Sequence, residues 1–160
     1  MMHDVEPGVA EELQGLLIPQ RKTPLLLPTA AVIEILGYRE ITESTADVSW
    51  LLGSFSWRNL QLPLVSIERM LGVERESTRG RKRIIVIHVF SDKLKLPFIG
   101  IEATGMPRLV TLNKDNLEVV TEGDPWPHEW PISDRVKVQD IEALIPDLER
   151  LGALLQEVAP

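Results

Sequence analysis

The sequence predicts a mainly β protein, built as a sandwich or as a pair of small barrels. Apolar segments of strand length recur about ten times along the chain, and many are bounded by Pro, Gly, Asn or Asp. Helical spacing of apolar residues is found only in brief stretches and near the C-terminus. Short strands at close spacing with little helix are typical of β sandwiches and barrels.

A hairpin is predicted near the N-terminus. The apolar runs LQGLLIP (13–19) and TPLLLP (23–28) are of strand length, and the polar connection 20–22 separates them. Residues 1–11 are charged and lack a periodic apolar face, so we expect them to form a flexible tail.

The next segment, TAAVIEILG (29–37), predicts a short helix. Thr29 is a candidate N-cap, and Gly37 can end the helix. Three apolar residues lie at helical spacing: Ala30, Ile33 and Leu36. If these three face the core, Val32 is left exposed between them. A strand is expected to follow at 38–42.

The stretch GSFSWRNLQLPLVSIERMLG predicts a second hairpin and a helical turn. Strands at 54–57 and 60–66 are joined by Arg58 and Asn59, a permanent charge beside a turn former. Pro63 has no N–H, which predicts an edge strand or a bulge. The segment SIERMLG fits a short helical turn that its final glycine closes.

The polar segment 75–82 is the predicted link between two halves, 12–74 and 83–158. After it, RIIVIHVF (83–90) is the strongest strand signal and is apolar enough to be covered on both faces. A turn leads from it into KLKLPFIGI (93–101), the next predicted strand.

The C-terminal part predicts three more strands and one helix. The strands are expected at 108–111, 136–139 and 141–145. The segment 147–158 has leucines at helical spacing with Asp147 as N-cap, which predicts an amphipathic terminal helix.

Composition excludes several classes of protein. The 17 Lys and Arg against 24 Asp and Glu give a net charge of -7, which opposes binding to phosphate backbones and anionic lipid. The chain has no cysteine, so disulfides and Cys-ligated zinc are excluded. No signal-peptide pattern and no apolar run near the roughly 18 residues of a membrane span occurs. We therefore expect a cytoplasmic protein without direct membrane insertion.

The residues that carry chemistry do not form a catalytic pattern. The three histidines, His3, His88 and His128, have no partner at ligand spacing, and His88 is expected to pack within its apolar strand. Neither a glycine-rich phosphate loop nor a G-x-S-x-G motif is present. We therefore expect a protein that is not an enzyme, with no catalytic residues, no cofactor and no metal.

Two segments leave other binding functions open. The loop GDPWPHEWP (123–131) carries Trp126, His128 and Trp130, which could form a small-ligand site on a β-barrel, although such tryptophans more often anchor their own loop. The basic run 79–83 could contact nucleic acid, but it lacks an interleaved aromatic residue and the net charge opposes it. We favour a structural role for the first and a solvated connection for the second.

Taken together, these segments resemble the CheW family of chemotaxis coupling proteins. The family's central motif stands here as Gly53, a short strand, Arg58-Asn59, the strand LQLPLV and the pair Glu68-Arg69, with Asn in place of the usual Gly. Three further segments resemble the family in the same order: PTAAVIEIL, RIIVIHVF with FIGIEATGMPRLVTL, and IEALIPDLERLGALL. The likeness covers 12–158 as a single domain.

The resemblance implies two five-stranded SH3-like barrels around a shared core, with short helices and a C-terminal helix. It also implies a scaffold that couples methyl-accepting receptors to a CheA-type histidine kinase. Barrel edges would meet the kinase, and the groove between the barrels would meet the receptor's cytoplasmic tip. Thr104 in place of the usual Asp and the loop 121–134 depart from the family, which favours a divergent member of the kind that serves pilus arrays controlling twitching motility.

Four residues are candidates for partner binding: Val32, Glu34, Arg58 and Asn59. Arg58, at a hairpin tip, is expected to reach Glu34 on the predicted helix and to hold the hairpin and helix at one angle. Val32 is expected to be exposed for contact with a partner, with burial in the core as the alternative.

Overall fold

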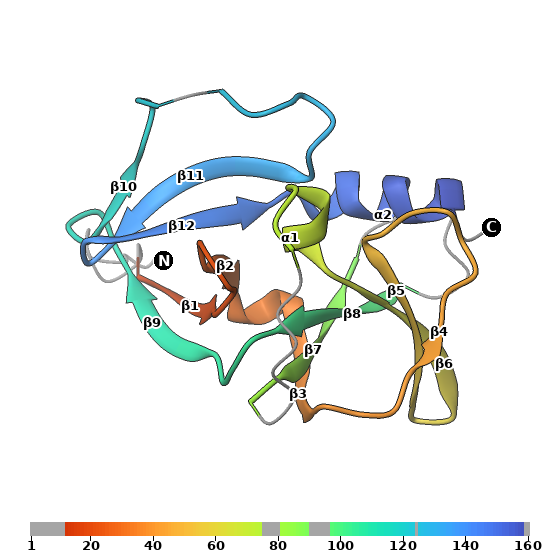
Figure 1. Cartoon of the computed structure of the whole chain (residues 1–160). Coiled ribbons are helices and arrows are strands. Elements are labelled where there is room, and N and C mark those ends of the chain that lie inside the picture. The colour runs from red at the N-terminus through yellow and green to blue at the C-terminus, as the bar shows by residue number, and fades with distance from the viewer. Residues whose placement is uncertain (1–11, 75–80, 90–96, 124, 159–160) are drawn as a thin grey trace, which may run out of the picture.

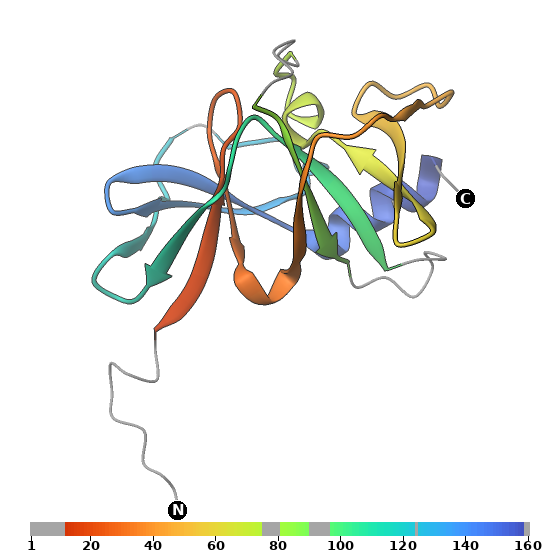
Figure 2. The ribbon, with the colours of Figure 1, turned by 90° about the horizontal axis from the view of Figure 1, so that it is seen from below.

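The computed structural model describes residues 12–74, 81–89, 97–123 and 125–158, and it contains two six-stranded sheets (Figure 1). The predicted tail 1–11 and most of the predicted link 75–82 lie outside the described residues. Seen from below, the sheets curve into two lobes side by side, which we call the first and second barrels (Figure 2). The mainly β fold is thus confirmed.

The first barrel has the strand order β10-β11-β12-β2-β1-β9. Its strands are β1 (Leu13–Ile18), β2 (Leu25–Pro28), β9 (Arg108–Leu112), β10 (Leu117–Val119), β11 (Ile132–Val138) and β12 (Ile141–Pro146). The second barrel has the order β3-β7-β8-β6-β5-β4. Its strands are β3 (Val32–Gly37), β4 (Thr42–Glu43), β5 (Leu51–Trp57), β6 (Leu60–Val65), β7 (Arg83–His88) and β8 (Phe98–Ala103). Each sheet has six strands where five were predicted, and the short strands β10 and β4 each lie at an edge.

Both sheets draw strands from both of the predicted halves, so the barrels do not follow the division into 12–74 and 83–158. Parallel pairs join distant segments: β12 pairs with β2 at Leu144 and Leu25, and β6 pairs with β8. Local patterns of apolar residues predict where strands lie, but they carry no information on which distant strand is the partner.

The buried residues form three clusters, one inside each barrel and one between the barrels. Strand β7 contributes residues to two of these clusters. Ile84 and Val86 face the interior of the second barrel, while Ile85 and Ile87 face the shared cluster. The prediction that this strand is covered on both faces is confirmed. The shared cluster also includes residues of β1 and β2 from the first barrel, so the two barrels pack on a common core.

Two helices complete the fold. Helix α2 (Leu148–Val158) places Leu151 and Leu155 in the shared cluster, and the Asp147 side chain accepts a hydrogen bond from the Arg150 N–H at 3.0 Å. The predicted N-cap is therefore confirmed. The short helix α1 (Ile67–Met70) is capped by Ser66, whose side chain accepts a hydrogen bond from the Arg69 main-chain N–H.

The predicted helix at 29–37 is wrong. Only Thr29–Ala31 form a helical turn, the 3₁₀ helix η1, and Val32–Gly37 form strand β3, paired with β7. Val32, Ile33 and Ile35 are β-branched residues, which favour a strand, and pairing with the apolar β7 outweighs the helical spacing.

Of the two alternatives predicted for Pro63, the edge strand is wrong, since β6 lies between β5 and β8. The register of β5 with β6 shifts between Leu51 and Gly53, one pair away from Pro63, which is closer to the predicted bulge. The pairing of β6 with β8 begins at Leu64, which lies opposite Gly100, so Pro63 precedes this ladder.

Candidate functional site

The hairpin of β5 and β6 ends in a two-residue turn formed by Arg58 and Asn59. Their φ angles are 48° and 64°, so both residues have left-handed backbones. Two consecutive positive φ angles are the pattern of a type I′ turn, whose twist matches that of the flanking strands. Asn adopts this conformation more readily than most residues, which explains why it can stand where the family usually has Gly.

Glu34 joins this turn to β3. Its Oε1 accepts hydrogen bonds from the Trp57 indole Nε1 at 3.0 Å and from Arg58 Nη2 at 3.2 Å. The Arg58 guanidinium also lies 4.4 Å from the centroid of the Trp57 ring. We call Glu34, Trp57 and Arg58 the hairpin-tip cluster. The predicted contact of Arg58 with Glu34 is present, although Glu34 lies on a strand rather than on a helix.

Solvent exposure shows which members of the hairpin-tip cluster serve stability. Trp57 is only 3% exposed and fills the second barrel, whereas the side chains of Arg58 and Glu34 are 64% and 40% exposed. An exposed ion pair contributes little to folding because water screens both charges. The guanidinium and the carboxylate are therefore held in place by Trp57 and remain accessible at the surface.

The Trp57 hydrogen bond holds the pKa of the Glu34 carboxyl below its ordinary value, and the Arg58 charge acts in the same direction. Partial burial opposes this shift but does not reverse it. Glu34 is therefore ionised at neutral pH, and the tip presents a fixed pair of opposite charges.

Val32 is half-buried and packs against the shared core, so it is neither fully exposed, as predicted, nor fully buried, as in the alternative. The register shifts between Val32 and Glu34, and Ile33, within this bulge, is 39% exposed. Of the residues expected to face the core, Ala30 is also exposed. Successive side chains of a strand point to opposite faces, whereas those of a helix do not. This difference accounts for the burial of Val32 in place of Ile33.

Partly exposed apolar residues of both barrels occur on β1, β3 and β9. Leu16 and Val32 both pack partly exposed against the shared core, and Leu109, opposite Leu16 in register, is 62% exposed. Figure 2 shows β1, η1 and β3 following one another across this side of the molecule, with β9 beside β1. We call Leu16, Val32, Ile33 and Leu109 the inter-barrel surface.

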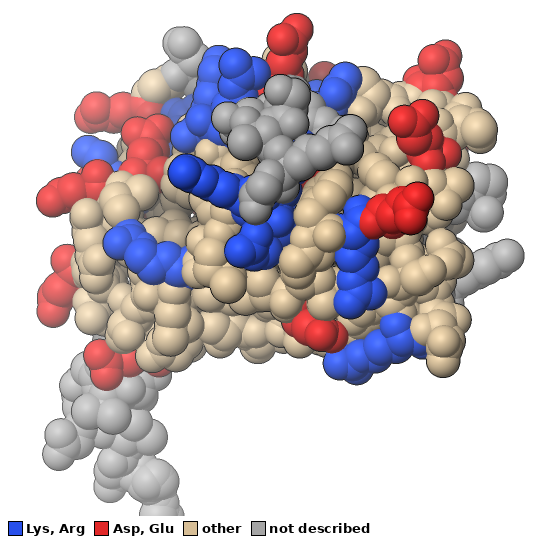
Figure 3. All heavy atoms as spheres, turned by 60° about the horizontal axis from the view of Figure 1, so that its bottom comes forward, with Lys and Arg blue, Asp and Glu red and all other residues tan. Residues whose placement is uncertain are grey.

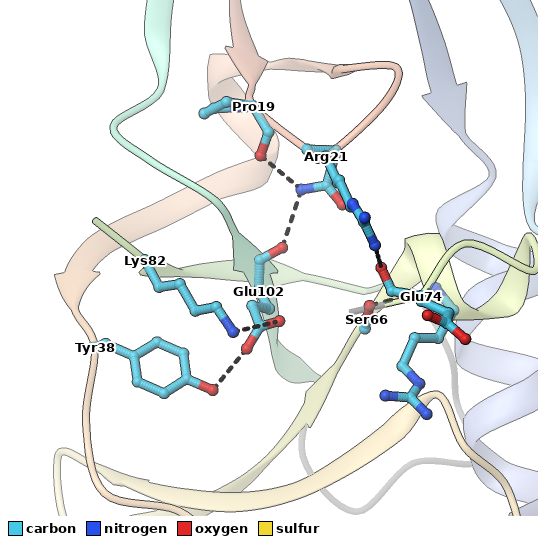
Figure 4. Close-up of polar contacts among 9 residues, drawn as sticks. Pro19, Arg21, Tyr38, Ser66, Glu74, Lys82 and Glu102 are labelled. Atoms are coloured by element: carbon cyan, nitrogen blue, oxygen red, sulfur yellow. Dashed lines mark hydrogen bonds and ion pairs between the residues drawn. The ribbon is translucent and has the colours of Figure 1, made fainter. Parts of the chain in front are cut away.

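A buried polar network links the barrels near the end of β8 (Figure 4). Lys82 Nζ lies 3.7 Å from Glu102 Oε1, and these side chains are only 5% and 6% exposed. The Tyr38 hydroxyl donates to Glu102 Oε2 at 2.6 Å. Gln20, in the first barrel, donates to the main-chain carbonyls of Glu102 at 3.0 Å and Pro19 at 2.9 Å. The network therefore fixes the β1–β2 loop against the second barrel.

The buried network was not predicted from the sequence. A signal was present, because FIGIEA carries one carboxylate in an apolar strand, and a lysine directly precedes the apolar strand that pairs with it. Opposite charges on adjacent buried strands indicate an ion pair.

Glu68 makes a second link to the same loop. This buried side chain accepts the Lys22 main-chain N–H at 2.9 Å. Burial raises the pKa of the Glu68 carboxyl, an effect that its hydrogen bonds with the loop main chain only partly offset. Two buried glutamates, at 68 and 102, thus hold one loop.

The tryptophan loop packs against its own domain. Trp126 and Trp130 are partly buried against the shared core, and the Arg135 guanidinium lies 5.2 Å from the centroid of the Trp126 ring. Both rings also line a hollow of about 230 Å³ and another of about 510 Å³, and His128 lines the larger one. The predicted anchoring role is supported. The first hollow is smaller than usual for small-molecule sites, whereas the second, which all three predicted residues line, is of the usual size.

The basic run 79–83 is not a continuous exposed surface. Residues 79 and 80 lie outside the described part, while Lys82 is buried with Glu102 and Arg83 donates to the carbonyls of residues 81 and 82. His88 packs edge-on against Phe98 as expected, with ring centroids 5.6 Å apart. Across the described ranges, no group of three or more His, Asp or Glu side chains could hold a metal ion. No helix in the same ranges is long and apolar enough to cross a membrane.

Comparison with known proteins identifies the family. The model of the CheW-like domain matches residues 14–154. The chain belongs to the CheW-like family. Among solved structures, this CheW-like chain is similar to the scaffolding protein TtCheW from Thermoanaerobacter tengcongensis, with a TM-score of 0.72 and 14% identity. That likeness covers 87% of this chain and 91% of TtCheW, and at this identity it shows the fold. No curated protein sequence matches the chain significantly.

Proposed function

We propose that this CheW-like chain is a chemosensory scaffold that couples the cytoplasmic tips of methyl-accepting receptors to a CheA-type histidine kinase. The observation that carries the proposal is the two-barrel architecture around a shared core, matched by the CheW-like family over 14–154. A scaffold that holds two proteins together needs binding surfaces and a fixed geometry but no reactive residues. The protein would act in the cytoplasm and reach the membrane through its partners.

The described surface offers features suited to each partner. The inter-barrel surface is apolar and partly exposed, as a contact with a receptor's helical hairpin requires. The hairpin-tip cluster presents Arg58 and Glu34 beside it on β3 and the β5–β6 turn. Glu34, Arg58 and Asn59 are our candidates for partner contact at this tip, and Val32 contributes from the inter-barrel surface.

The test is reconstitution with a receptor cytoplasmic fragment and the cognate kinase. Receptor-dependent stimulation of kinase autophosphorylation should require this protein. Arg58→Ala should melt close to the wild-type temperature yet weaken pull-down of receptor or kinase, because the exposed pair contributes little to folding. Normal coupling by Arg58→Ala, with only a lowered melting temperature, would remove the interface role of the tip.

We further propose that the pathway controls twitching motility through type IV pili. The support is the divergent sequence, including the two-tryptophan loop and Thr104. Deletion of the gene should abolish directed twitching and leave swimming intact, whereas the reverse phenotype would assign the protein to a flagellar pathway.

A further inference from the structure

The larger of the two hollows that the tryptophan loop lines brings aromatic rings and opposite charges together. We call it the tryptophan hollow. Its volume is about 510 Å³, and the residues that line it include Trp126, Trp130, Asp147 and Arg150. Small-molecule sites combine a volume of this order with apolar walls and a few polar groups that orient the ligand.

Three segments meet at the tryptophan hollow, and hydrogen bonds fix them to one another. The loop that carries the tryptophans leads into β11 beside the start of α2, where the Asp147 N–H donates to the Pro131 carbonyl at 2.8 Å (Figure 1). Ser133, which also lines the hollow, lies where the register of β11 with β12 shifts, and its hydroxyl donates to the Ile145 carbonyl at 3.2 Å. Bulges of this kind often re-aim a side chain next to a functional site. The wall of the hollow is therefore set by the fold.

Arg150, in the first turn of α2, carries a charge that the fold does not pair. Its guanidinium forms no hydrogen bond or ion pair with the residues that the structure describes, and its Nε is buried without a partner. The dipole of a helix also opposes a cation in the first turn. Because the side chain is half-buried and has lost part of its hydration, a carboxylate that reaches it gains more than at the open surface.

Asp147 lines the same hollow without neutralising Arg150. Its Oδ1 accepts the Arg150 main-chain N–H at 3.0 Å, but among the described residues no ion pair joins the two side chains. The wall thus presents two separate points of opposite charge. A ligand with both an ammonium and a carboxylate can contact both points, whereas a purely anionic or cationic ligand would also meet a like charge.

The tryptophan rings supply an apolar surface next to these charges. Trp126 and Trp130 are half-buried, and they pack against the shared core as well as lining the hollow. Indole rings bind flat apolar groups by stacking or by edge contacts. A ligand that fits the whole hollow therefore carries an apolar group beside its two charges.

We propose that the tryptophan hollow binds a small zwitterion with an apolar side group, of the α-amino-acid type. Arg150 pairs with the carboxylate of the ligand, Asp147 pairs with its ammonium, and the tryptophan rings cover its side group. This binding site is additional to the scaffold role and does not depend on it.

The test follows the indole N–H resonances of the four tryptophans by NMR while L-phenylalanine is added to the full chain. The resonances of Trp126 and Trp130 should shift, and that of Trp57, inside the second barrel, should not. Two analogues probe the charges separately: phenylpropionate lacks the ammonium, and phenethylamine lacks the carboxylate. Phenylalanine should bind about tenfold more tightly than either analogue, because each has lost one charge-assisted contact.

Three results with the wild-type protein would overturn the inference. The first is that either analogue binds as tightly as phenylalanine. The second is that neither Trp126 nor Trp130 shifts at about 10 mM phenylalanine, a concentration at which a ligand of this size should bind a fitting site. The third is that the neutral sugar maltose shifts these two resonances more strongly than phenylalanine does.

Charged side chains of both signs also occur on other parts of the surface, so the test needs a matched control (Figure 3). Arg150→Gln removes the cation of the hollow, and Lys137→Gln removes one exposed cation elsewhere on the first barrel. Arg150→Gln should weaken phenylalanine binding about tenfold, and Lys137→Gln should change it by less than about twofold. Asp147→Asn keeps an acceptor for the cap of α2 and should abolish the preference for phenylalanine over phenylpropionate.

Circular dichroism checks that each variant folds. Equal affinity of Arg150→Gln and wild type for phenylalanine overturns the inference. If Arg150→Gln does not fold, the comparison of the three ligands on the wild-type protein decides.

Discussion

The buried ion pair of Lys82 and Glu102 makes a sharp prediction about stability. We expect Lys82→Met to destabilise the protein because it removes the cation beside the buried Glu102 carboxylate, to which the Tyr38 hydroxyl also donates a hydrogen bond. At a separation of 3.7 Å and an effective dielectric constant of about 20, the lost attraction is about 4.5 kcal/mol. This agrees with the cost of about 3 to 5 kcal/mol for removing one partner of a buried pair.

Urea denaturation at neutral pH, followed by tryptophan fluorescence, measures this loss as a change in the free energy of unfolding. The double variant Lys82→Met/Glu102→Gln should recover much of the stability, because it removes both buried charges and keeps an acceptor for Tyr38. Arg58→Met, which breaks an exposed pair, is the matched control and should unfold close to wild type.

Two results would refute this reasoning. The first is a loss below about 1 kcal/mol for Lys82→Met, which would mean that water reaches the carboxylate. The second is a double variant as unstable as the single one, which would mean that packing of the lysine stem, rather than the charge, is responsible.

Three further predictions concern single residues. Gly100→Ala should cost about 1 to 3 kcal/mol, because its Cβ would lie 2.5 Å from the Phe55 ring, whereas Gly37→Ala, with open space around it, should be neutral; equal urea midpoints would contradict this. Asp147→Ala should cost about 1 kcal/mol by removing the cap of α2, and Asp147→Asn, which retains an acceptor, should restore most of the loss in thermal melts. The raised pKa of Glu68 means that the folded state binds the proton more tightly, so stability from this group is present at low pH and is lost as pH rises above the ordinary value of 4.5. Relative to wild type, Glu68→Gln should therefore gain stability as pH rises from about 4.5 toward 7, and parallel profiles of urea midpoint against pH would exclude this.

The sequence allowed prediction of strands wherever burial leaves an unambiguous pattern. Strand β7 is apolar at successive positions, so apolar side chains lie on both of its faces. These side chains belong to two different core clusters. In the segment 29–37, Ala30, Ile33 and Leu36 fit helical spacing, and only pairing with β7 makes residues 32–37 a strand. The parallel pairs β2–β12 and β6–β8 join segments far apart in the chain, so no local pattern could reveal them.

The candidate site was predictable to the extent that it depends on one turn. Arg58 and Asn59 mark a tight hairpin, and the contact with Glu34 followed from the family resemblance. The hydrogen bond from Trp57 was not predicted, because it depends on how β3 lies against β5 in space. The roles of Val32, Glu34, Arg58 and Asn59 in partner binding remain predictions.

The way in which the two barrels are joined bears on how a scaffold could relay a signal. The shared apolar cluster attracts the barrels but has little directional preference, since apolar contact is not directional. The hydrogen bonds of Gln20 and Lys22 to the main chain of Glu102 and the side chain of Glu68 do have direction, and they fix one loop of the first barrel on the second. A partner that binds one barrel is therefore held at a defined angle to a partner on the other, because a change of angle would break buried hydrogen bonds as well as slide apolar surfaces.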